Sequence, residues 1–418
     1  MNTSTAAATA ATPTAPVQDL ETRLRSLSRS VAARLTDAFT EALGAAPARA
    51  ALLVDRLGLD KTLASKLVRG LRAEEPLRAL LELPAPQGLG LAADAAARAG
   101  ASAPAVLAMR EEIERLAHLQ DEFPGGRSDL LAILSGWLPE TRDKEDRQAR
   151  QAAFRAMSTI TGTRYDALYN AYVYAPSATD PDVCDTAWIV ARLGLRRLRH
   201  GPSIRLTSMR ADETGTDVPR RLTLAGQPLD RSPRRLLVPA FCSDPLPGLE
   251  VQEATGRFDL VLGPTSPPLD RAADLALGSL SRGLVPRFRT EDRAWDYTMH
   301  TATRPARVLI VDLLVHRDLY DGRPPIATAQ LGGGTPDLRG PRSEQADQID
   351  LPLEQRTLGN GLSRLGSSEV PRCQELLTHA FGELGWDPEL FRVYRVRVPY
   401  PAPTVTILLW LELPEGPG

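Results

Sequence analysis

The sequence predicts an α+β protein with a helical N-terminal half and a β-rich C-terminal half. Up to about residue 200, apolar residues recur at spacings of three and four, as they do on one face of a helix. Beyond that point proline and glycine become frequent, and short β-rich runs lie between them. We therefore expect a disordered tail over 1–16, a helical domain over 17–100, a second helical domain or connector over 101–200, and an α+β domain over 201–418.

The composition is that of a soluble globular protein and excludes several classes. Hydrophobic residues make up 43% and charged residues 24% of 418, and the formal net charge is −2, so any nucleic-acid site must be a local patch. Three distant cysteines offer neither a zinc motif nor a disulfide framework and predict a cytoplasmic protein. No apolar run approaches the ~18 residues that a membrane span needs, and residues 1–16 lack the features of a signal peptide.

The first predicted helix covers residues 17–45. Its apolar residues form one stripe, made of Leu20, Leu24, Leu27, Val31, Leu35, Phe39 and Leu43. Such a stripe could pair two copies of the chain or pack on its own domain. The repeat is too short to indicate a coiled coil, which favours packing on its own domain.

The segment over residues 50–71 predicts two helices joined by a sharp turn at Gly58. Glycine suits such a turn because it tolerates positive φ. Leu53 and Val54 precede the turn, and Asp60 can cap the second helix by accepting a backbone N–H. Ala64 and Leu67 then face inward.

The outer face of the second helix carries hydrogen-bond donors and positive charge. The side chains left on this face are Lys61, Thr62, Ser65, Lys66 and Arg69. Between Arg49 and Arg72 there are six basic and two acidic residues, a local net charge of +4. A positive patch on a slightly acidic chain is expected where a protein contacts phosphate groups.

The run VDRLGLDKTLASKLVRGL resembles the helix-turn-helix of phage-repressor and Cro-type regulators. The resemblance implies that Lys61, Thr62, Ser65 and Lys66 face base edges or phosphates of DNA. Three positions depart from the pattern. Val54 stands at the helix crossing where alanine is usual, and Ala64 stands where valine or isoleucine is usual. Leu63 is apolar where a polar residue is common, and it could contact a thymine methyl or be buried in protein.

The run LGLDKTLASKLV also resembles the recognition region of winged-helix regulators of the multiple-antibiotic-resistance type. A wing would require a β-hairpin soon afterwards, and residues 76–90 show no strand alternation. The sequence therefore favours the simpler tri-helical form.

Further helices are predicted over 104–122, 128–138 and about 145–174. In the last of these, Tyr165, Tyr169 and Tyr172 would share one helical face, either as a ligand-facing stripe or, as we favour, as a packing face. Strands are predicted at 203–209, 235–241, 257–263, 306–316, 391–400 and 404–413, with a helix near 370–384.

The densest ionisable cluster lies in residues 287–300. On a helix, Asp292, Asp296 and His300 would be one turn apart, a spacing that could bind a metal or perform acid–base chemistry. A solvated helix face with ion pairs is the favoured interpretation. We therefore expect no catalytic residue, metal or cofactor.

These observations predict a DNA-binding transcriptional regulator whose C-terminal half binds an effector or holds protomers together. The expected partners are double-stranded DNA and a small-molecule or protein effector, with a homodimer reading two half-sites. The alternative is a non-enzymatic interaction or scaffold protein with a helical docking domain. A third hypothesis is an enzyme built around residues 287–300.

Overall fold

The computed structural model describes residues 15–210, 221–341, 347–351 and 353–416. It confirms the α+β class, with helices concentrated in the N-terminal part and sheets in the C-terminal part. The chain divides into two compact units, residues 1–145 and 146–418. The domain boundary expected near residue 200 thus falls inside the second unit.

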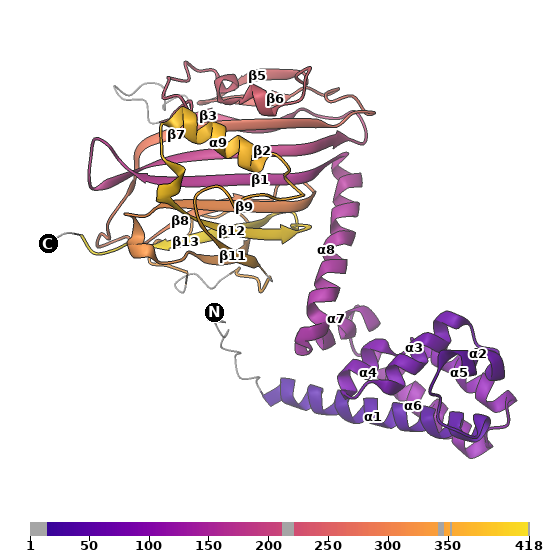
Figure 1. Cartoon of the computed structure of the whole chain (residues 1–418). Coiled ribbons are helices and arrows are strands. Elements are labelled where there is room, and N and C mark those ends of the chain that lie inside the picture. The colour runs from indigo at the N-terminus through magenta and orange to yellow at the C-terminus, as the bar shows by residue number, and fades with distance from the viewer. Residues whose placement is uncertain (1–14, 211–220, 342–346, 352, 417–418) are drawn as a thin grey trace. The chain divides into compact units, whose positions relative to one another are not determined.

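The first unit is a bundle of α-helices with its own apolar core (Figure 1). Its helices are α1 (Ala15–Leu43), α2 (Ala50–Leu57), α3 (Lys61–Arg72), α4 (Pro76–Glu82), α5 (Pro86–Arg98), α6 (Ala103–Asp121) and α7 (Arg127–Trp137), followed by the first residues of α8 (Pro139–Thr161).

Helix α1 packs on its own unit, as the favoured interpretation of its stripe predicts. Leu24, Val31, Leu35 and Phe39 are at most 1% exposed and belong to the bundle core. Helix α1 begins at Ala15, so it overlaps the last two residues of the tail expected over 1–16. Residues 1–14 lie outside the described residues.

The helix predicted over 145–174 ends early, which corrects the expectation for the tyrosines. Helix α8 stops at Thr161, Gly162 takes a φ of +65°, and strand β1 runs from Thr163 to Pro176. The tyrosines therefore lie on a strand and share no helical face. Both faces of β1 are buried, so the strand lacks the polar alternation that would have identified it.

Strand β1 lies inside a seven-stranded sheet in the second unit. Its order is β11 (Glu354–Asn360), β12 (Phe391–Pro399), β9 (Ala306–His316), β1, β2 (Val183–Arg197), β7 (Ala273–Pro286) and β4 (Arg221–Leu222). Strands β1 and β9 are parallel, and the other pairs are antiparallel.

Two three-stranded sheets complete this unit. One has the order β10 (Ile326–Leu331), β13 (Val405–Glu412) and β8 (Trp295–Thr301), and the other the order β3 (Ile204–Arg210), β6 (Arg257–Leu262) and β5 (Leu249–Ala254). The strand predicted at 235–241 is wrong. Short 3-10 helices form there instead, at Pro233–Leu236 and Pro239–Phe241, where each proline fixes φ and removes a donor. Two more lie at Tyr320–Gly322 and Pro388–Leu390.

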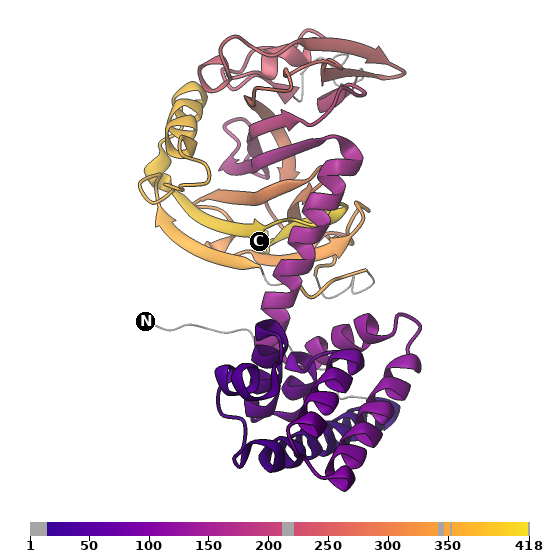
Figure 2. The same ribbon diagram turned by 90° about the vertical axis from the view of Figure 1, so that its right-hand side faces the viewer.

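Apolar cores cover both faces of the seven-stranded sheet. Helix α9 (Cys373–Leu384) lies over one face, where Leu377 and Phe381 join Tyr169 of β1 in a buried cluster (Figures 1 and 2). On the other face, Ile407 and Leu409 of β13 pack with Leu168 of β1. On the side of the large sheet opposite α9, strands β8 and β13 form a second layer over β1 and β2. The region between these two layers is called the interlayer space.

Candidate nucleic-acid interface

The two predicted helices and the turn between them occur where the sequence places them. Gly58 ends α2 with a φ of +65°. Its N–H donates to the Val54 carbonyl at 3.0 Å, and the Leu59 N–H donates to the Leu53 carbonyl at 3.4 Å. The Gly58 bond, which runs from the residue after the helix to the carbonyl four residues earlier, is that of the αL motif and satisfies one of the last carbonyls of α2. Leu57 and Leu59 are buried on either side of the glycine, which fixes the path of the turn.

Asp60 caps α3 as predicted. Its carboxylate accepts the backbone N–H groups of Thr62 at 2.7 Å and Leu63 at 3.3 Å. These bonds hold the pKa of the Asp60 carboxyl below its ordinary value because they favour the charged form. The start of α3 is therefore well defined, although its side chains are exposed.

The inner face of α3 anchors the helix in the bundle. Ala64 and Leu67 are fully buried, in agreement with the sequence. Gly70 lies close to α4 and the residue after it, since a Cβ added there would be 2.6 Å from Leu83 Cδ2. A helix held on this face can present its opposite side in a fixed orientation.

The outer face contains the predicted DNA-contacting residues. Lys61, Thr62, Lys66 and Arg69 are exposed, and Ser65 is half-buried between them. Within the described residues, neither Lys61 nor Lys66 has a carboxylate within ion-pair distance. The two lysines therefore carry uncompensated positive charge at the start and middle of α3.

Arg69 differs from the two lysines because it is already paired. Its Nε lies 3.1 Å from a Glu82 carboxylate oxygen. Glu74, which is exposed, and Glu75, which pairs with Arg25 and caps α4, lie near the same end of α3. These acids come after residue 72, so the net charge of +4 counted over residues 49–72 overstates the positive charge around the end of α3. The positive part of the face is its N-terminal half.

Leu63 packs within the unit. It is half-buried and joins the bundle core, and its Cδ1 would lie 3.2 Å from a Cβ added at Gly88 in α5. Leu63 is thus partly buried within its own unit, and its contact with a thymine methyl stays a prediction. Lys61, Thr62 and Lys66 stay exposed, so α5 borders the outer face of α3 without covering it.

The ionisable cluster of residues 287–300 is not a helix, which corrects that expectation. Asp296 and His300 lie on strand β8, and Asp292 is exposed in the loop before it. Asp296 is buried and pairs with Arg293, and burial raises its pKa despite that partner. Burial, with a smaller effect from Arg192, lowers the pKa of His300 to about 3. Within the described residues, no three potential ligands gather as a metal site would require.

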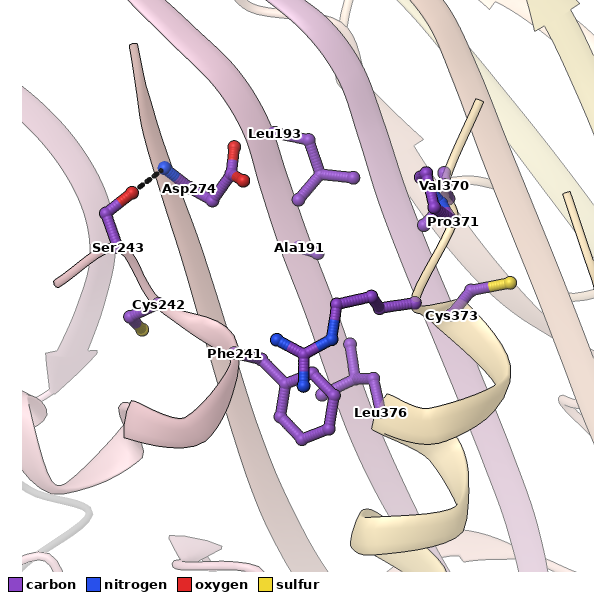
Figure 3. A pocket seen from close by; sticks show the side chains of 11 residues that line it. Ala191, Leu193, Phe241, Cys242, Ser243, Asp274, Val370, Pro371, Cys373 and Leu376 are labelled. Atoms are coloured by element: carbon purple, nitrogen blue, oxygen red, sulfur yellow. Dashed lines mark hydrogen bonds between the residues drawn. The ribbon is translucent and has the colours of Figure 1, made fainter. Parts of the chain in front are cut away.

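The second unit contains a cleft that the sequence did not reveal. Its volume is about 220 Å³, and it opens where the start of α9 meets β2, β7 and the 3-10 helix Pro239–Phe241. Phe241 and Leu376 give it an apolar end, and Ser243 and Asp274 line its polar end (Figure 3). The Ser243 hydroxyl accepts the Asp274 N–H at 2.8 Å. Arg372, the residue before α9, lies 4.4 Å above the Phe241 ring. Apolar walls with a few placed polar groups are typical of small-molecule sites.

Comparisons with known proteins found no matching family model, no matching curated protein and no matching solved structure. Among the helices described, none combines the length and the apolar character that a membrane crossing would require.

Proposed function

We propose that this protein binds double-stranded DNA through the outer face of α3 and acts as a transcriptional regulator. The observation that supports the proposal best is the exposed, unpaired state of Lys61 and Lys66 beside the exposed Thr62. Lysine side chains contact phosphate groups, and hydroxyl groups can reach phosphates or base edges. By its sequence, the segment resembles the recognition helix of repressor-type regulators.

The N-terminal half of α3 is the part that would enter the groove. It combines both lysines with the positive end of the helix dipole. Ser65 lies between them and is half-buried, so it would contribute only at close approach. Arg69 would first have to leave Glu82, and it therefore contributes less than its position in the sequence predicts.

The second unit would supply the regulatory part of this function. The cleft of Figure 3 has room for a small effector with an apolar body and a polar end. Two copies of the chain would read two half-sites, which is the usual arrangement for a small DNA-reading unit. A cytoplasmic location fits the three free cysteines of the described chain.

The direct test measures binding to a library of genomic DNA fragments at several salt concentrations. We expect the wild-type protein to bind duplex DNA with an affinity that falls steeply as salt rises, because phosphate contacts release counterions. The double variant K61E/K66E should lose this binding and keep its circular dichroism spectrum, since both side chains are exposed.

A charge-matched variant makes this test specific to α3. Arg29 on α1 and Arg98 on α5 are also exposed, and no ion pair of either is seen within the described chain. R29E/R98E changes the net charge by the same amount as K61E/K66E and should retain DNA binding. Equal losses in both variants would show that net charge, and not α3, governs the interaction.

The alternative function is a protein-interaction module with a helical docking surface. The contact of Leu63 with α5 and the pairing of Arg69 with Glu82 favour it, because both engage α3 within its own unit. It becomes the better explanation if the wild-type protein binds no genomic fragment even at low salt.

A further inference from the structure

Three arginines gather around Tyr165 at one end of the interlayer space. They are Arg192 and Arg197 on β2 and Arg304 in the loop between β8 and β9. Burial raises the pKa of Tyr165, and all three arginines lie near enough for their charges to act in the opposite direction. This group, Tyr165 with Arg192, Arg197 and Arg304, is here called the arginine cluster. No acid among the described residues forms an ion pair with any of the three.

Arg192 is the least compensated member of the cluster. Among the described residues its guanidinium has only neutral partners, the Tyr169 and Ala191 carbonyls at 3.4 Å and the Asn170 Oδ1 at 3.4 and 3.5 Å. These contacts are longer than the 2.7–3.2 Å of ordinary N–H···O bonds, which indicates weak bonds. Burial lowers the pKa of Arg192, because removal from water disfavours the charged form.

Arg197 and Arg304 differ in how many of their hydrogen-bond donors have partners in the protein. Arg197 donates to the carbonyls of Ser266, Gly263 and Pro202 at 2.6–3.1 Å, so it is held in place and mainly adds positive charge. Arg304 donates to the Thr163 hydroxyl at 3.3 Å. Its remaining donors are therefore free to serve a ligand.

Neutral polar groups next to Arg192 also have unused hydrogen-bonding capacity. The Nδ2 of Asn170, the Nε2 of His300 and the Oγ1 of Thr298 are buried without partners. Asn170 on β1 contacts the Arg192 guanidinium through its Oδ1. His300 on β8 lies near enough to Arg192 for that charge to lower the pKa of His300, and Thr298 lies two residues before His300 on the same strand. Buried polar atoms without partners are rare in native proteins and often mark a missing water or ion.

We propose that the arginine cluster binds a compact oxyanion, a carboxylate or phosphate group, in the interlayer space. Arg192 and Arg304 would donate to its oxygens, and the Asn170 amide and the Tyr165 hydroxyl would complete the set. Arginine guanidinium groups match the geometry of carboxylate and phosphate oxygens.

Charge decides between an oxyanion and water at this place. Water could satisfy single donors, but it would leave the half-buried Arg192 guanidinium without a counter-charge, which costs free energy where solvent is partly excluded. A chloride ion supplies charge without the paired oxygens that a guanidinium fork binds best. The proposal does not depend on DNA binding, since the arginine cluster and α3 belong to different units.

The experiment measures binding of inorganic phosphate and of succinate to the full chain by calorimetry, with chloride at equal ionic strength as reference. Binding of phosphate alone would identify a phosphate site, and binding of succinate alone a carboxylate site. We expect R192Q and R304Q each to weaken binding of the preferred anion by about 30-fold or more, since each removes a half-buried positive charge that would donate to the anion. If neither anion binds the wild-type protein more tightly than chloride, the proposal is overturned.

A control variant locates the site. Arg356 is exposed on β11, so R356Q should bind the anion as the wild type does. Unchanged binding in R192Q and R304Q, or an equal loss in R356Q, would place the anion elsewhere and overturn the proposal.

A second measurement keeps the proposal testable if the variants bind too weakly for calorimetry. Without added oxyanion, R192Q should melt no lower than the wild type, because it removes a half-buried charge that has no acidic partner among the described residues. Added phosphate or succinate should then raise the melting temperature of the wild type only. A lower melting temperature of R192Q in the absence of oxyanion would show that the protein itself already stabilises the Arg192 charge. That result would contradict the proposed oxyanion site.

Discussion

At the scale of single residues, two arginines of the second unit differ in their partners: the buried Arg395 has a carboxylate beside it, and the half-buried Arg192 has none among the described residues. Arg395 of β12 donates from Nε and Nη2 to the Asp312 carboxylate of β9, both at 2.7 Å, and Asp312 also accepts the Tyr169 hydroxyl at 2.7 Å. Burial by itself would lower the pKa of Arg395, but the bonds and charge of Asp312 raise it above the ordinary value. Arg192 lacks such a partner, which is why we assign a ligand to it and none to Arg395.

We predict that D312A strongly destabilises the protein. Asp312 is fully buried, and its removal leaves the Arg395 charge and the Tyr169 hydroxyl without their partner. Breaking a buried pair in this way costs about 3–5 kcal/mol of the free energy of unfolding, which denaturant titration would measure.

The double variant D312L/R395M separates the pair from the packing around it. It removes both charges, so it should be less destabilised than D312A. A double variant that is no more stable than D312A would show that the ionic bond itself, and not the unpaired charge, accounts for the loss.

At the scale of secondary-structure elements, α3 is positioned by a glycine contact. Gly70 faces Leu83 so closely that an added Cβ would meet the Leu83 side chain at 2.6 Å and its backbone nitrogen at 3.2 Å. The glycine therefore permits the close approach of α3 to the end of α4, and this approach helps to set the direction of the outer face.

We predict that G70A and G90A have opposite effects on stability. G70A should cost about 1–3 kcal/mol of the free energy of unfolding, because overpacking forces the neighbouring residues to shift. Gly90 lies inside α5 with no atom within 4 Å of an added Cβ, so G90A should stabilise by up to about 1 kcal/mol through helix propensity. Thermal unfolding of both variants is the measurement, and a G70A variant as stable as G90A would contradict the close contact.

At the scale of the whole molecule, the division into two units has a direct consequence. The first unit has a core of its own, drawn from residues between Leu24 and Leu134, and the second has one core on each side of its large sheet. Separate cores are the property that allows domains to fold independently.

We predict that residues 15–138 fold alone as a helical domain. The fragment should show a helical circular dichroism spectrum and a cooperative thermal transition, because its buried apolar residues find their partners within it. A fragment that melts without a cooperative transition would show that the bundle depends on the rest of the chain.

Features that depend on residues close together in the sequence were predicted correctly, and features that depend on residues far apart in the sequence were missed. The turn at Gly58 and the cap at Asp60 were predicted because each depends on neighbours within a few residues. Strand β1 was missed because its residues are buried on both faces, and because one of its two partner strands, β9, begins 130 residues after β1 ends. The state of Arg69 was missed because its partner, Glu82, lies 13 residues further along the chain on another helix, α4.

The sequence alone determined the class of the fold, helices α1, α2, α3, α6 and α7 of the first unit and the basic character of α3, because these depend on periodicity, caps and local charge. Only the tertiary structure decided which charges are compensated. Lys61 and Lys66 have no acidic partner within the described chain, Arg69 and Arg395 are paired, and Arg192 is enclosed among neutral groups. The physical reason is that an ion pair needs only proximity in space, and the proximity of distant segments is set by strand pairing and helix packing.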